Sequence, residues 1–166
     1  MLLLIRVIDG LNQRTAQVIR WLALFMVLVT VTIVILRYLF GIGAIFLQES
    51  VMYMHGILFM LAIPFTLRAD GHVRVDLIYS RLSQKHKNWI DAGGHVLLLL
   101  PVSVFIFVTS LPYVSASWRV LEGSSEVGGV PAVFLLKTLM PLMAVLLFLQ
   151  GLSEIAKRLL PSAGKP

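Results

Sequence analysis

The sequence predicts an all-α integral membrane protein with four transmembrane helices, both termini in the cytoplasm and an amphipathic, interfacial N-terminal segment. Composition is the first reason, because 58% of the 166 residues are hydrophobic and only 13% are charged, against about 25% charged residues in soluble domains. The second reason is that basic residues gather at the ends of long apolar stretches. We expect a single membrane domain, 1–166, because four spans leave no length for a soluble one.

Each span needs about 20 mostly apolar residues to cross the hydrocarbon layer. The predicted spans cover residues 21–37, 50–67, 90–114 and 131–155, and a polar loop covers 68–89. Before the first span, polar and apolar residues recur at three- and four-residue spacing, which predicts an amphipathic helix. This helix lies along the inner membrane surface or is a solvated lead-in to the first span.

The distribution of positive charge predicts the topology. Eleven of the 14 Lys and Arg residues fall in the N-terminal segment, the middle loop or the tail, whereas the other two connections hold only Arg37 and Arg119. Positive loops stay in the cytoplasm, so both termini and the loop 68–89 are expected there. An even number of spans agrees with this orientation.

Several functional classes lack support in the sequence. There is no cysteine, which excludes disulfides and thiol catalysis, and no phosphate loop, zinc-protease motif or nucleophile elbow occurs. The basic residues follow helix ends and do not form a nucleic-acid pattern. Glu49, Asp91 and Glu154 lie near span ends, which argues against a stand-alone proton-coupled pump. We therefore predict neither an enzyme nor a cofactor.

Two histidines raise an alternative, a cytochrome-type membrane anchor that binds haem. Neutral imidazoles on two helices can ligate one haem from both faces. His55 and His95 are expected to differ in height by roughly 10 Å, which disfavours a shared haem. The other interpretation is that each histidine hydrogen-bonds a neighbouring helix.

Three charged residues near the outer side are candidates for structural or partner contacts. Arg37 and Glu49 flank the first outer connection and emerge at similar height, so they either pair or act as independent interfacial charges. Lys137 lies about two turns inside the fourth span. Its stem either snorkels to the outer interface or carries the ammonium to a partner subunit or to Glu49.

The stretch Gly-His-Val-Arg-Val-Asp, residues 71–76, resembles the signature of the small, DctQ-like membrane subunit of tripartite ATP-independent periplasmic (TRAP) transporters. Other features agree with this family: Arg37-Tyr38 ends the first span, Glu49 begins the second, and a Ser- and Gly-bearing loop leads to Pro131 before the fourth span. The resemblance covers nearly the whole chain.

The resemblance implies a function and partners. In this family a periplasmic binding protein captures an organic acid, a large multi-span membrane subunit carries it inward with sodium, and the small subunit packs against the large one. The outer segment 115–130 is then a possible contact for the binding protein. His72, Arg74 and Asp76 of the signature become candidates for structural contacts, and the middle-loop cations for contacts with membrane lipids. A third alternative is an independent small channel or exporter.

Overall fold

The computed structural model describes residues 2–71 and 79–159, and it is helical throughout these ranges apart from the connections. Four helical segments are long and apolar enough to cross a membrane: Leu3–Phe40, Ile45–Arg68, Gln84–Arg119 and Val133–Leu159. The predicted all-α fold with four spans is therefore confirmed. Each segment extends beyond its predicted span by several residues on at least one side, because helices continue into the interface beyond the purely apolar stretch.

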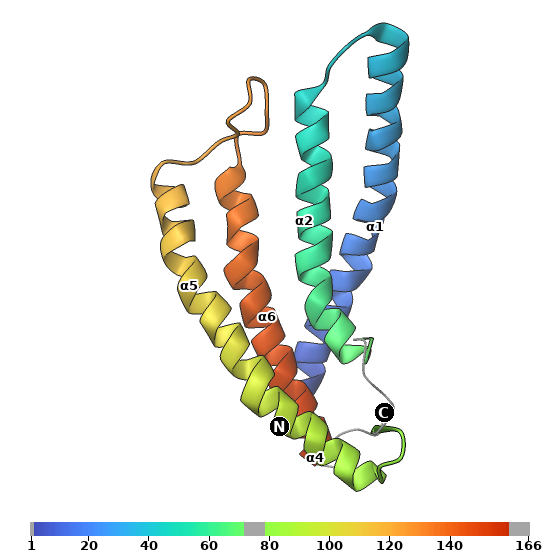
Figure 1. Ribbon diagram of the computed structural model, residues 1–166, viewed down its shortest axis with the longest axis vertical. Helices are drawn as coiled ribbons and strands as arrows, with labels where there is room; N and C mark the ends of the chain where they lie inside the picture. Colours follow the sequence, from blue (N-terminus) through green and yellow to red (C-terminus); the bar gives the residue numbers. More distant parts are fainter. Residues whose placement is uncertain (1, 72–78, 160–166) are drawn as a thin grey trace.

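Helix α1 (Leu2–Phe40) and helix α2 (Ile45–Arg68) form an antiparallel hairpin (Figure 1). Their short connection contains Gly41 with a φ of 66°, a left-handed conformation that glycine adopts without strain and that stops a helix. Helix α1 is uninterrupted, so the predicted amphipathic segment is its first half. The segment buries Ile5, Ile8 and Ile19; its interfacial position stays a prediction.

The third span is composite. Helix α4 (Gln84–Gly94) continues through a π-helical turn, η1 (His95–Leu99), into helix α5 (Leu100–Arg119). The backbone N–H of Leu100 donates to the His95 carbonyl, the i→i−5 bond of a π turn. Pro101 follows directly, and its ring has no N–H and crowds the carbonyl of the preceding turn. The wider π turn accommodates that proline inside a continuous helix.

Helix α6 (Val133–Leu159) is the centre of the structure, because it contacts α1, α2, α4, η1 and α5. It is also the helix with most buried residues, among them Met143, Ala144 and Leu146. The contact between α6 and η1 depends on a small residue at position 151, because a Cβ at Gly151 would overlap the Leu99 side chain of η1. Small residues at such points let membrane helices approach closely.

The two hairpins, α1/α2 and α5/α6, converge at one end and spread apart at the other (Figure 1). We call the converging end the basal end; it holds the start of α1, the end of α6 and helix α4. The opposite end, called the loop end, holds the connection 41–44 and the loop 120–132. Both ends of the described chain are thus at the basal end, as an even number of spans requires, and their cytoplasmic orientation stays a prediction.

Candidate functional site

Polar side chains are concentrated at the two ends of the bundle. At the basal end they form a connected group, which we call the basal cluster: Asp9, Asn12, Arg68, Asp91, Gln150, Ser153, Glu154, Lys157 and Arg158. The polar residues contributed by α6 follow three- and four-residue spacing, so they share one helix face. That face points toward α1, α2 and α4, and the basal cluster therefore joins four helices.

The centre of the basal cluster is Gln150, whose side chain is completely buried. Its carbonyl oxygen accepts a 2.7 Å hydrogen bond from the Asn12 amide. Its amide group donates to Asp9 at 3.0 Å and to Glu154 at 2.9 Å. Inside a membrane protein an unpaired amide is costly, so the bonds of Gln150 fix α1 against α6.

Three cations balance the three carboxylates of the basal cluster. The Lys157 ammonium lies 2.7 Å from both Asp9 and Glu154. The Arg158 guanidinium donates to Asp91 at 3.1 Å and to Glu154 at 2.9 Å. The third cation, Arg68 on α2, is 3.7 Å from Asp9. Paired charges of this kind avoid the cost of an isolated buried ion, and they hold helices together.

At the loop end, Glu49 holds the loop 120–132. Its carboxylate accepts hydrogen bonds from the Ser124 hydroxyl and, at 2.6 Å, from the Val130 backbone N–H. Gly129 lies directly beside this contact, and a Cβ there would overlap both Ser124 and the Glu49 carboxylate. The first turn of α2 and the loop between α5 and α6 thus interlock, and only glycine fits position 129 without displacing one of the partners.

A second group of contacts at the loop end is made by Lys137 of α6. The Lys137 ammonium pairs with the Glu122 carboxylate and lies 4.1 Å from the centre of the Tyr113 ring, a cation–π arrangement. The ammonium lowers the pKa of Glu122 below its ordinary value. Nearby, the Trp118 indole donates to the Thr138 hydroxyl at 2.8 Å. Together these contacts connect the end of α5 to the start of α6.

The structure changes two of the sequence-based interpretations. Arg37 is exposed and does not pair with Glu49, which binds the loop 120–132 instead. Lys137 does not reach Glu49, because its side chain is only 15% exposed and its ammonium pairs with Glu122; snorkelling of its stem to the outer interface stays a prediction. In both cases the loop folds back onto the helices and supplies partners that spacing along a helix does not reveal. His72, Arg74 and Asp76 lie outside the described residues.

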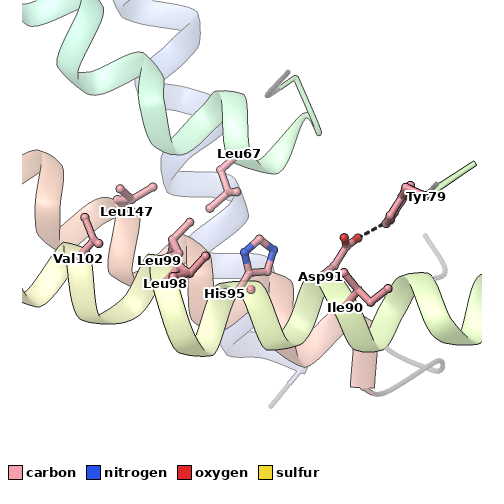
Figure 2. Close-up of a pocket in the computed structure, with 10 residues that line it drawn as sticks. Leu67, Tyr79, Ile90, Asp91, His95, Leu98, Leu99, Val102 and Leu147 are labelled. Atoms are coloured by element: carbon pink, nitrogen blue, oxygen red, sulfur yellow. Dashed lines mark hydrogen bonds between the residues drawn. The ribbon is translucent and has the colours of Figure 1, made fainter. Parts of the chain in front are cut away.

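The two histidines occupy different environments. His55 is exposed on α2 and stacks on Phe59 with ring centres 6.1 Å apart. His95 lies on η1 and lines a cavity of about 630 Å³ between α2, α4–α5 and α6. Figure 2 shows the imidazole among apolar side chains that include Leu67 and Leu99, with Asp91 and Tyr79 at the polar end, joined by a 2.8 Å hydrogen bond. His55 is not among the residues that line this cavity, which gives no support to a haem held by both histidines.

The fold, the basal cluster and the contacts of Glu49 and Lys137 at the loop end define a polytopic membrane protein. Its paired charges hold helices and a loop together. Residues 26–160 match the family model DctQ, described as the DctQ component of tripartite ATP-independent periplasmic transporters. The chain belongs to this family of transporter components, and the resemblance expected from the sequence is confirmed. No curated protein and no solved structure matches the chain. Family membership implies a complex with a large membrane subunit and a periplasmic binding protein.

Proposed function

We propose that this chain is the small permease subunit of a sodium-coupled transporter in a bacterial inner membrane, which imports an organic acid delivered by a periplasmic binding protein. Its own role is to pack on the large membrane subunit and stabilise that subunit's scaffold. The observation that carries the proposal is the family match over residues 26–160. Sodium coupling, the class of substrate and the scaffold role are expectations from this membership.

The distribution of charged and apolar side chains in the described residues favours a structural role for this chain over a role as the carrier itself. Their carboxylates occur mainly at the two ends of the bundle, and several are paired with cations from other helices. A subunit that itself carries an ion or an acid through the membrane is expected to place polar groups along the path. Here large apolar side chains cover the lengths of α1 and α5, for example Phe25, Leu28 and Phe105, which suits contact with lipid and with a partner's helices.

The loop 120–132 supports a contact with the periplasmic binding protein, within the segment 115–130. Glu49 and Lys137 hold the loop in a defined shape, and the side chain of Glu126 points into solvent. If the basic termini are cytoplasmic, this loop faces the periplasm. A rigid, exposed acidic loop is a suitable docking element, because a preorganised surface loses little entropy on binding.

Reconstitution tests the proposal. The chain, the large membrane subunit and the binding protein are purified, and carboxylate ligands of the binding protein are identified first by thermal shift. Proteoliposomes are then assayed for uptake of the radiolabelled ligand. Uptake is expected to need the small subunit and an inward sodium gradient. Uptake that is unchanged without this chain would refute the scaffold role, and uptake that is unchanged in potassium would refute sodium coupling.

The haem alternative has a simple test. Purified protein is expected to be colourless, since the two histidines do not line one cavity. A Soret absorption band that is lost in a His95→Leu variant would contradict the proposed function and support the cytochrome-type anchor.

A further inference from the structure

A recess at the basal end is separate from the cavity of Figure 2. Lys85, Asn88 and Trp89 of α4 line it from one side, and Arg158 and Leu159 of α6 from the other. Its volume is about 370 Å³, far above the roughly 15 Å³ that one ordered water requires. The recess can therefore hold a chemical group of substantial size.

The polar side chains that line the recess are hydrogen-bond donors, and no carboxylate is among the lining residues. The Asn88 carbonyl oxygen accepts a 2.9 Å bond from Gln84, so its amino group is the part left to donate. Arg158 is held in place by the carboxylates of Asp91 at 3.1 Å, Glu154 at 2.9 Å and Asp70 at 3.8 Å. Lys85 is exposed and forms no ion pair with any described residue. Lys85 therefore supplies the charge of the recess that no carboxylate balances, and Asn88 supplies a further donor beside the guanidinium of Arg158. This arrangement suits an anion that carries several oxygens.

The surroundings indicate an anion attached to an apolar tail. Trp89 is 63% exposed and Leu159 is 48% exposed, and tryptophan is enriched where a membrane protein crosses the headgroup layer. Val96, also exposed, lies two turns beyond Trp89 and so on the same side of the helix. An apolar strip thus leads from the cationic recess toward the membrane interior.

We propose that this recess binds the headgroup of an anionic phospholipid of the inner leaflet, with its phosphate between Lys85 and Arg158 and an acyl chain along Trp89 and Val96. Basic pockets between transmembrane helices on the cytoplasmic side bind such headgroups. The bound lipid bridges α4 to the end of α6. This inference does not depend on the substrate or on the coupling ion of the proposed transporter.

Native mass spectrometry of the full chain tests the site. The chain is titrated with palmitoyl-oleoyl-phosphatidylglycerol and, separately, with palmitoyl-oleoyl-phosphatidylcholine. We expect one preferred phosphatidylglycerol molecule and about fivefold weaker binding in Lys85→Gln, because one cation near the membrane surface is lost. Asn88→Leu removes a donor without changing the charge and is also expected to weaken binding.

Lys87→Gln is the matched control, because it removes the same charge from the same helix while Lys87 is not among the residues that line the recess. It is expected to leave the affinity for phosphatidylglycerol within about twofold of the wild type. Equal affinity for both lipids would overturn the proposal. So would equal losses in the Lys85 and Lys87 variants together with an unchanged Asn88 variant, since that pattern means diffuse attraction without a site.

Discussion

The ammonium of Lys157 lies 2.7 Å from the carboxylate of Asp9 and so joins the last turns of α6 to the third turn of α1. The two residues stand at opposite ends of the sequence. Because Asp9 also accepts hydrogen bonds from Gln150 and Ser153, α1 can take only one register along α6. The amphipathic first half of α1 is thus positioned by polar contacts as well as by the three isoleucines that it buries.

Replacing Gln150 by leucine is expected to destabilise the chain by about 1–3 kcal/mol or more. The side chain is fully buried and makes hydrogen bonds to three other side chains, and Gln150→Leu leaves the Asn12 amide in an apolar environment without its acceptor. Unfolding in increasing sodium dodecyl sulfate, followed by circular dichroism, measures the loss.

The control for this prediction is Gln17→Leu. Gln17 lies on α1 and is exposed, so the same chemical change removes no buried bond. It is expected to alter stability by less than about 0.5 kcal/mol. If the two substitutions lowered the free energy of unfolding equally, the buried hydrogen bonds of Gln150 would make no specific contribution to stability.

The contact between Gly151 and Leu99 gives a second prediction. Gly151→Ala places a methyl group where the Leu99 side chain now lies, so η1 must move away from α6 at a cost of about 1–3 kcal/mol. Adding Leu99→Ala to this variant restores the space. The double variant is therefore expected to be less destabilised than the sum of the two single variants, in the same unfolding assay.

Gly94→Ala is the matched control, because a Cβ at Gly94 meets no atom within 4 Å. Alanine favours the helix relative to glycine, so this variant is expected to be as stable as the wild type or slightly more stable. Strict additivity of the Gly151 and Leu99 substitutions would contradict the packing argument.

The fold could be predicted from the sequence because membrane spans depend on local composition. Four apolar stretches bounded by charges fix the number of helices, and the helices observed contain almost all of the predicted residues. The continuation of α1 back to Leu2 was not predicted, although its three- and four-residue pattern indicated a helix. No breaker such as proline separates the two halves of α1, and this is why they form one helix.

The contacts between distant segments were harder to predict. Residues 150, 153, 154 and 157 share one face of α6, and this spacing could have indicated a polar helix contact; the partners, Asp9 and Asn12, lie more than 130 residues away. For Glu49 the sequence offered only Arg37 as a candidate partner, beside the alternative of two independent charges, because Arg37 is closer in sequence than the loop 120–132 that binds Glu49. The π turn at η1 could not be predicted from the sequence, because Pro101 indicates a local distortion of the helix without specifying its form.

The third prediction concerns Gly129. In Gly129→Ala the new methyl group overlaps Ser124 and the Glu49 carboxylate, so the loop 120–132 must separate from α2. The Val130 amide, which now donates to Glu49 at 2.6 Å, is expected to lose at least tenfold in its protection against hydrogen exchange. Mass spectrometry of peptides from this loop measures the change.

Gly43→Ala provides the control, because Gly43 lies in the other connection at the loop end and a Cβ there meets no atom within 4 Å. Its effect on exchange in the loop 120–132 is expected to be negligible. Unchanged protection of Val130 in Gly129→Ala would mean that Glu49 does not hold the loop in solution.

The last prediction is a pH dependence at the loop end. The Lys137 ammonium lowers the pKa of Glu122 below its ordinary value of 4.5, so the unfolded chain takes up this proton before the folded chain does. The stabilisation from the pair is therefore complete above about pH 4.5 and is lost as the pH falls through the lowered pKa. The melting temperature of the wild type is expected to exceed that of Glu122→Gln at neutral pH, and the difference is expected to shrink only below that value.

Glu126→Gln serves as the reference, because Glu126 is exposed in the same loop and its carboxylate forms no ion pair with any described residue. Its melting temperature is expected to follow the wild type throughout the titration, since the substitution breaks no pair. A difference between wild type and Glu122→Gln that stays constant from pH 7 to pH 3 would mean that the interaction does not depend on the charge of Glu122. In that case Glu122 would stabilise the loop through hydrogen bonding that does not need its charge, together with Glu49 and the Trp118–Thr138 hydrogen bond.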